Sequence, residues 1–115
     1  MKPVRVIFSP EAEEAYNKLN EAADSKIERS ILNAIDKKKE LIKANPHYGE
    51  PIAKDKIPEE YKQKYGITNL FWVELANFWR MLYTLTNENE IEIIAFVLDM
   101  IDHEKYNKKF GYKGH

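Results

Sequence analysis

The sequence predicts an α+β fold with the element order β-α-α-β-β-β and a short C-terminal helix. Apolar residues first alternate along a short strand and then recur at helical spacing in two consecutive segments. Three strand-like segments follow, separated by turn residues. A helix pair that leads into a three-stranded meander is typical of helices on one face of a mostly antiparallel sheet. We therefore expect a single domain over residues 1–115, with a helical hairpin packed on one face of a mostly antiparallel four-stranded sheet.

The N-terminal segment predicts a strand followed by a capped helix. Apolar residues occupy alternate positions from Val4 to Phe8, as they do on one face of a strand. Ser9 then precedes Pro10, which is the favoured order of an N-cap residue and a first helical residue. Apolar residues at helical spacing continue this first helix to Leu19.

A second helix is predicted between Ser25 and Asn45. Ser25 and Glu28 have the spacing of a capping box, in which each side chain bonds the backbone of the other. An apolar stripe at helical spacing continues to Ile42, and Pro46 ends the helix. The two helices are therefore expected to form an antiparallel hairpin with one apolar side.

Two further short helices are predicted from residues that start and stop helices. Residues 46–66 form a looser segment, which is expected to hold a short helix between Pro58 and Gly66. The segment 102–110 predicts a C-terminal helix whose first residue, an Asp, is the cap and which Gly111 stops.

The three later strands are expected at residues 67–75, 79–86 and 91–98. A turn centred on Asn77 pairs Glu74 with Arg80, and a second turn over residues 87–90 pairs Arg80 with Val97. The same register pairs Tyr83 with Ile94 and Leu82 with Ala95. A slip of one residue in either turn would move every side chain of a strand to the opposite face.

This register divides the sheet into two faces. The face expected to pack on the helices carries Phe71, Val73, Leu75, Trp79, Met81, Tyr83, Leu85, Ile94, Phe96 and Leu98. The opposite face is mixed and carries Trp72, Glu74, Arg80, Leu82, Thr84, Ile93, Ala95 and Val97. Because an acid, an arginine and an aromatic ring share an apolar floor there, we expect the functional site on this second face.

The composition is that of a globular chain. Of the 115 residues, 43% are apolar and 32% are charged, which excludes a disordered chain and a collagen-like repeat. The absence of Cys excludes a disulfide scaffold, a thiolate metal site and a Cys nucleophile. We find no export signal and no apolar run near the roughly 20 residues of a membrane span. We therefore expect a cytoplasmic protein with no membrane contact.

The charge is nearly balanced overall but unevenly distributed. The net charge of −1 argues against a strongly basic nucleic-acid binder. However, the segment Lys105–His115 holds four lysines and no acid, while five acids lie within residues 11–24, at the start of the predicted helical hairpin. A local basic tail of this kind can hold a phosphate chain.

Two motifs resemble the RelE/ParE toxin superfamily of type II toxin–antitoxin systems. The strand motif Arg-x-x-Tyr spans Arg80 to Tyr83, and the C-terminal motif His-x-x-Tyr spans His103 to Tyr106. The C-terminal ending resembles that of a RelE-like subgroup common in archaea. The other matching segments, in the family's order, are residues 8–12, 45–46 and 106–112.

The resemblance implies a fold and a function. The first strand is expected beside the last and parallel to it. The function implied is that of a metal- and cofactor-independent endoribonuclease that cuts mRNA on the ribosome, with a cognate antitoxin as partner and the free toxin as a monomer or a homodimer. A ParE-like toxin that inhibits a topoisomerase by protein contact is an alternative. A degenerate member that only binds its antitoxin is another, because residues 70–75 lack the lysines that RelE carries on this strand.

Four residues are the candidates for catalysis. Arg80 matches the family's strand arginine and is expected to contact the scissile phosphate. His103 is expected as a general acid or base, and Tyr106 as a residue that stacks on a base or orients the phosphate. Glu74 is a candidate base by its chemistry and strand position alone. Structural roles remain open for all four: a cross-strand Glu74–Arg80 ion pair, a first-turn helix position for His103, and packing against the sheet for Tyr106.

Three further residues are candidates for RNA binding. Lys105 and Lys109 belong to the basic tail and are expected to contact phosphates. Trp72 is expected either to stack on a base or to anchor the antitoxin. The three His residues show no metal-ligand spacing, so we expect no metal site.

Overall fold

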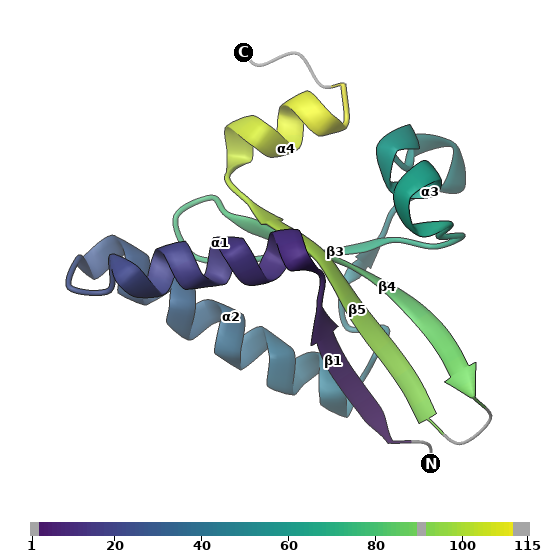
Figure 1. The fold of residues 1–115 in the computed structure, drawn as a ribbon, viewed down its shortest axis with the longest axis horizontal. Coiled ribbons are helices and arrows are strands. Elements are labelled where there is room, and N and C mark those ends of the chain that lie inside the picture. The colour runs from purple at the N-terminus through teal and green to yellow at the C-terminus, as the bar shows by residue number, and fades with distance from the viewer. Residues whose placement is uncertain (1–2, 90–91, 112–115) are drawn as a thin grey trace.

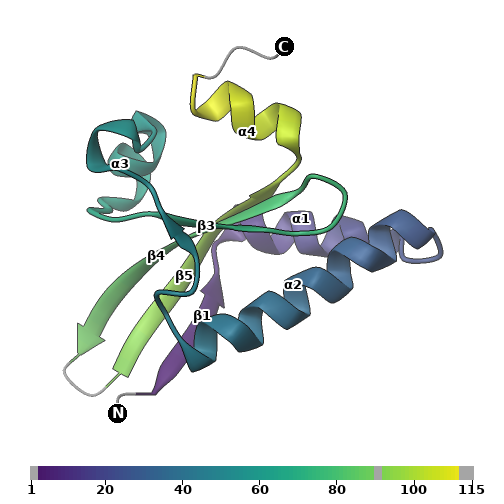
Figure 2. The same ribbon diagram turned by 180° about the vertical axis from the view of Figure 1, so that it is seen from behind.

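Four helices and five strands make up the part of the chain that the structure, a computed structural model, describes: residues 3–89 and 92–111. Figure 1 shows β1 leading into the α1–α2 hairpin, with α3 and α4 on the far side of the sheet, and Figure 2 shows the same arrangement from behind. The elements are β1 (Val4–Phe8), α1 (Pro10–Glu21), α2 (Lys26–Ala44), β2 (Glu50–Pro51), the 3-10 helix η1 (Lys54–Lys56), α3 (Glu59–Tyr65), β3 (Phe71–Glu74), β4 (Arg80–Asn89), β5 (Glu92–Ile101) and α4 (His103–Lys109).

The sheet has five strands in the order β1-β5-β4-β3-β2, so the expectation of four strands is wrong. The α+β class is confirmed, and so is the parallel placement of β1 beside β5. The missed strand, β2, pairs only Glu50 and Pro51 with β3. A two-residue strand shows no alternation in sequence, and its proline is tolerated because β2 is an edge strand. The sheet is therefore mixed, with one parallel and three antiparallel pairings.

The helical hairpin begins as predicted at α1 but not at α2. The Ser9 hydroxyl accepts a hydrogen bond from the Ala12 amide at 3.0 Å and donates one to the Leu98 carbonyl at 2.7 Å, so the first cap also ties α1 to β5. Ser25 precedes α2 in an extended conformation, but its side chain makes no cap hydrogen bond. The predicted capping box is wrong, because the Glu28 carboxylate faces a hollow beside α1 instead of the Ser25 amide.

The strand predicted over residues 67–75 is shorter, because a side chain replaces part of its backbone pairing. The Asn69 amide oxygen accepts a hydrogen bond from the Leu85 amide at 2.8 Å, and the Asn69 amide nitrogen donates to the Leu85 carbonyl at 3.0 Å. Asn69 thus satisfies the β4 backbone as a neighbouring strand would. Regular pairing starts only at Phe71.

The register of β3 against β4 is as predicted, whereas that of β4 against β5 is wrong. Glu74 lies opposite Arg80, as the turn centred on Asn77 requires. Tyr83, however, lies opposite Val97 instead of Ile94. Two irregularities shift this ladder, one between Leu82 and Tyr83 and one between Thr86 and Asn89. Since a bulge inserts an unpaired residue, the alternation of side chains along β5 cannot be extrapolated from the turn. The predicted turn at residues 87–90 lies partly outside the described residues.

This shift exchanges the two faces of β5. Ala95 and Val97, expected on the open face, lie in the core beneath α1 and α2 with Met81 and Tyr83. Phe96 and Leu98, expected beneath the helices, belong to the opposite face. Ile93, also assigned to that opposite face, has its side chain outside the described part of the chain.

The opposite face is a second core and not an open surface. Leu82 on β4 is fully buried there, together with Tyr61 from α3 and Tyr106 from α4. The short helices predicted after Pro58 and after Asp102 are both present and cover this face. Apolar burial on both faces drives this arrangement. The candidate site therefore lies in what these two helices leave accessible.

Candidate functional site

The centre of the candidate site is a guanidinium group packed against two aromatic rings that meet edge to face. The Arg80 Cζ atom lies 4.1 Å from the Trp72 ring centroid and 4.3 Å from the Tyr106 ring centroid. Trp72 comes from the neighbouring strand β3, and Tyr106 comes from α4 on top of the sheet. The adjacent strand and the C-terminal helix therefore each give Arg80 one cation–π contact.

The hydrogen-bonding edge of this guanidinium is unused within the described residues. In residues 3–89 and 92–111, Arg80 makes no hydrogen bond or ion pair, although Glu74 lies opposite it across the β3–β4 pair. The suggested cross-strand ion pair is thus not formed, and Glu74 is exposed. Because a cation–π contact uses no hydrogen bond of the guanidinium, its N–H donors can still bind a carboxylate or a phosphate in bidentate fashion.

The His-x-x-Tyr motif, His103 to Tyr106, lies on the face of α4 that contacts Arg80. Asp102 caps the helix by accepting a hydrogen bond from the Lys105 amide at 2.9 Å. His103 is then the first helical residue, and Tyr106 and Asn107 follow at positions that share its face. His103 is exposed, with its Nε2 atom 3.2 Å from the Asn107 side-chain nitrogen. The motif therefore brings an accessible imidazole to the same helix face as the ring that stacks on Arg80.

Tyr106 has a structural role that the sequence left open. The side chain is buried, and its ring stacks on Phe110 at 4.3 Å between centroids, with an interplanar angle of 21°. It also lies 6.5 Å from the Trp72 ring in an edge-on arrangement. Tyr106 is therefore placed to position Arg80, and Trp72 packs against the same guanidinium from β3.

The two lysines predicted to bind RNA, Lys105 and Lys109, lie in different environments. Lys109 Nζ lies 2.8 Å from a Glu60 carboxylate oxygen and 3.7 Å from Asp99, so two carboxylates compensate its charge. Asp99 also accepts a hydrogen bond from the Tyr61 hydroxyl at 3.0 Å, and burial followed by the Asp99 charge raises the pKa of Tyr61 far above its usual range. Lys105 is exposed. Lys105 and Lys109 therefore do not gather as one basic patch around Arg80.

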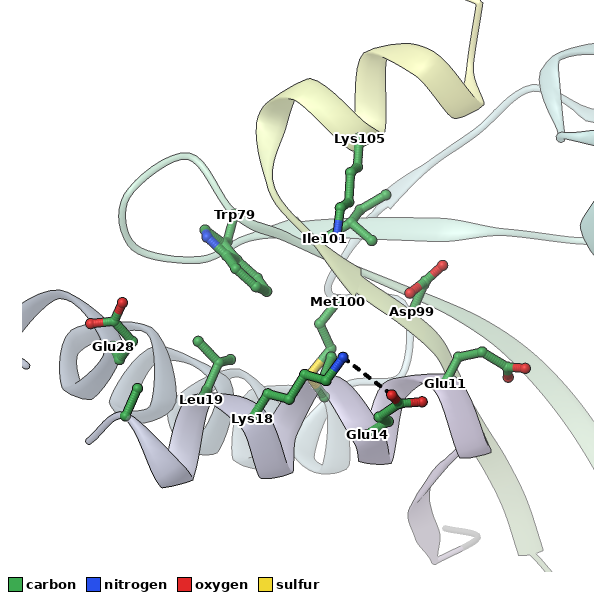
Figure 3. A pocket seen from close by; sticks show the side chains of 12 residues that line it. Glu11, Glu14, Lys18, Leu19, Glu28, Trp79, Asp99, Met100, Ile101 and Lys105 are labelled. Carbon is green, nitrogen blue, oxygen red and sulfur yellow. Dashed lines mark ion pairs between the residues drawn. The ribbon is translucent and has the colours of Figure 1, made fainter.

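Lys105 instead lines a hollow of about 410 Å³ on the α1 side of the molecule (Figure 3). Its floor is apolar and includes Leu19 and Met100, with Trp79 at one side. Its rim carries the carboxylates of Glu11, Glu14, Glu28 and Asp99, against the ammonium groups of Lys18 and Lys105. This hollow contains none of the four predicted catalytic residues, and its excess of acids is unsuited to RNA.

A smaller hollow of about 230 Å³ lies at the edge of β3 and includes two predicted residues, Trp72 and Glu74. Lys38 from α2 lines it as well, with its Nζ 3.1 Å from the Tyr48 hydroxyl. The position of Lys38 in this hollow could not be predicted, because Lys38 lies in a run of three lysines typical of a solvated helix side. The fold thus brings a lysine close to a strand that has none of its own.

Comparisons with known proteins do not assign this site. No family model matches the chain, and no curated protein matches it significantly. Within residues 3–89 and 92–111, no group of three His, Asp or Glu residues could hold a metal ion. Across the same residues, no helix has the length and apolar character needed to cross a bilayer.

Proposed function

We propose that this protein is a RelE/ParE-like toxin of a type II toxin–antitoxin system that cleaves mRNA at the ribosome without a metal ion. The observation that carries the proposal is the Arg80 guanidinium, packed against Trp72 and Tyr106 with its donors unpaired in the described residues. An arginine held by two aromatic rings is preorganised for a phosphate, since it gives up little side-chain entropy on binding. The resemblance of the motifs from Arg80 and His103 supports the same conclusion.

The proposed chemistry is an attack of a ribose 2′ oxygen on the adjacent phosphorus. The 2′ hydroxyl gives its proton to a base as the new O2′–P bond forms, and the P–O5′ bond breaks as an acid protonates the leaving oxygen. The products are a 2′,3′-cyclic phosphate and a 5′ hydroxyl. Arg80 neutralises the charge on the pentacoordinate phosphorane, His103 serves as acid or base, and Glu74 is the candidate for the complementary role.

The roles proposed for Arg80, His103 and Glu74 rest on different observations. Arg80 rests on a contact geometry, and His103 on its exposure and its place on the α4 face that meets Arg80. Glu74 rests on its position opposite Arg80 alone. An antitoxin is the expected protein partner from the resemblance, and the cytoplasm is the expected compartment because the sequence shows no Cys and no export signal.

Primer extension on ribosome-bound mRNA tests the proposal. Wild-type protein should produce discrete cuts, and His103→Ala should lower the rate roughly 10²- to 10⁴-fold, as expected for loss of an acid–base group. Arg80→Ala should lose most of the activity as well. Arg29→Ala is its matched control, because Arg29 is an exposed arginine on α2 whose side chain bonds only the Asp24 carbonyl among the described residues. Intact mRNA with growth arrest and DNA damage would instead support topoisomerase inhibition. The absence of any toxicity would support the degenerate member.

A further inference from the structure

An exposed aromatic ring stands at the tip of the β3–β4 turn. Phe78 has a φ of +64° and follows Asn77 with a φ of +55°, so two consecutive residues adopt left-handed backbone. The turn is closed by a hydrogen bond from the Leu75 amide to the Trp79 carbonyl at 2.8 Å. Asn is tolerated in this region, but a bulky side chain there is a true outlier that costs free energy.

Burial does not offset this backbone strain. The Phe78 side chain is 74% exposed, the largest exposure among the big apolar residues of the described chain. The other two such residues are Ile27 on α2 and Tyr48 just after it. A strained residue that gains no core contact points to function, because neither packing nor turn chemistry favours Phe at this position.

The ring lies beside the proposed catalytic histidine. The centroids of the Phe78 and His103 rings are 6.2 Å apart, with an interplanar angle of 54°. Arg80 follows Phe78 by two residues, and Tyr106 follows His103 by one helical turn. The β3–β4 turn and α4 therefore present two neighbouring pairs: Phe78 with His103, and Arg80 with Tyr106.

We infer that Phe78 is a stacking platform for a nucleobase of single-stranded RNA, next to the nucleotide whose phosphate Arg80 holds. This inference rests on the proposed function and names how that site selects its substrate. The ring lies beside His103 and two residues before Arg80, so it adjoins the groups placed for a phosphate chain, which favours RNA over a protein partner. A single exposed ring beside a phosphate-binding cation is the combination that recognises single strands, since every base offers a face for stacking. Duplex RNA hides these faces and should bind weakly.

A binding experiment with a short single-stranded RNA tests this platform. Phe78→Leu should weaken binding roughly 5- to 150-fold, the range expected for loss of one base–aromatic stack, whereas Phe78→Tyr should bind as wild type does. Removing a base at one position of the RNA should weaken wild-type binding by the same factor and abolish the difference from Phe78→Leu. Phe78→Leu is expected to fold, because the side chain is exposed.

The dependence of binding on salt separates the two ideas. Arg80→Lys should alter the salt dependence of binding only modestly but weaken affinity, and Arg80→Ala should reduce the slope by about one phosphate contact. Phe78→Leu should leave that slope unchanged. If Arg80→Ala alters neither affinity nor slope, the proposed function fails. If Arg80 matters and Phe78→Leu binds every RNA as wild type does, the stacking platform alone is overturned.

Discussion

Replacing Tyr83 by Phe removes one hydroxyl that holds the edge of the sheet together. The Tyr83 hydroxyl donates to the Pro46 carbonyl at 2.8 Å and accepts from the Gly49 amide at 2.9 Å. The Tyr83 side chain is fully buried and Gly49 is buried, so water cannot readily replace these bonds. Tyr83→Phe should therefore leave a buried N–H unpaired and one half-buried carbonyl weakened.

The expected loss follows from these two groups. An unsatisfied buried donor costs about 1–3 kcal/mol, and the carbonyl adds a smaller amount, so we expect Tyr83→Phe to lower the free energy of unfolding by about 2–4 kcal/mol. For a domain of this size such a loss lowers Tm by roughly 6–16 °C. Urea unfolding followed by circular dichroism measures the first quantity, and a thermal melt measures the second.

Tyr48→Phe is the matched control. Tyr48 is exposed and its hydroxyl meets only Lys38 among the described residues, so the change should stay within about 0.5 kcal/mol of wild type. If Tyr83→Phe is as stable as Tyr48→Phe, the hydroxyl does not fix the segment before β2, and the reasoning on this edge is wrong.

Three further changes test other parts of the structure. Gly49→Ala should destabilise the fold by about 1–3 kcal/mol in denaturant unfolding, because a Cβ there would lie 2.9 Å from the Tyr83 hydroxyl oxygen and 3.0 Å from the Trp72 carbonyl oxygen. Hydrogen bonds from Lys64 and Tyr65 lower the pKa of Glu11 to about 2, so this carboxylate stabilises the fold above pH 4.5 and loses that contribution as the pH falls towards 2. The Tm of Glu11→Gln should accordingly fall less than that of wild type over this range, and parallel curves would contradict the assignment. Trp72→Leu should keep the core apolar but remove one of the two cation–π contacts of Arg80. We expect a lower rate of RNA cleavage with little change in Tm, and a cleavage rate equal to that of wild type would count against a role for this contact.

The part of the fold that follows local signals could be predicted from the sequence. Ser9, Pro10 and Asp102 mark helix starts through their own side chains, and the structure contains both caps. The turn at Asn77 fixes the register of β3 on β4 over only a few residues, so the Glu74–Arg80 pairing was predictable as well. These features depend on interactions between residues close in sequence.

The register of β5 could not be predicted, because it depends on contacts made at long range. The irregularity between Leu82 and Tyr83 places an extra residue in β5, near the point where the Ser9 hydroxyl bonds the Leu98 carbonyl. Nothing in the local pattern of β5 marks this bulge, since both of its faces are apolar. Ala95 and Phe96 were assigned to the wrong faces because of the other irregularity, between Thr86 and Asn89, which lies between the turn and these residues and shifts their register by one.

The candidate site was predictable in its central residue and not in its surroundings. The Arg80 guanidinium packs against both Trp72 and Tyr106, although the sequence contained these residues as separate candidates. Lys109 is held by Glu60, which lies on α3, 49 residues earlier in the chain, so its neutralisation was invisible in sequence. Phe78 was missed because a turn centre is normally polar, and the mismatch between its residue type and its position was the available signal.

The proposed role of Arg80 in mRNA cleavage is tested most directly by the rate at which ribosome-bound mRNA acquires 2′,3′-cyclic phosphate ends. This rate is measured with wild-type protein and with Arg80→Lys. Lysine keeps the positive charge but lacks both the planar faces that stack on Trp72 and Tyr106 and the bidentate donor edge. We expect cleavage by wild-type protein and a rate roughly 10²- to 10³-fold lower for Arg80→Lys, with the fold intact by circular dichroism. Equal rates for the two proteins, or ends that carry no cyclic phosphate, would refute the proposed role of Arg80.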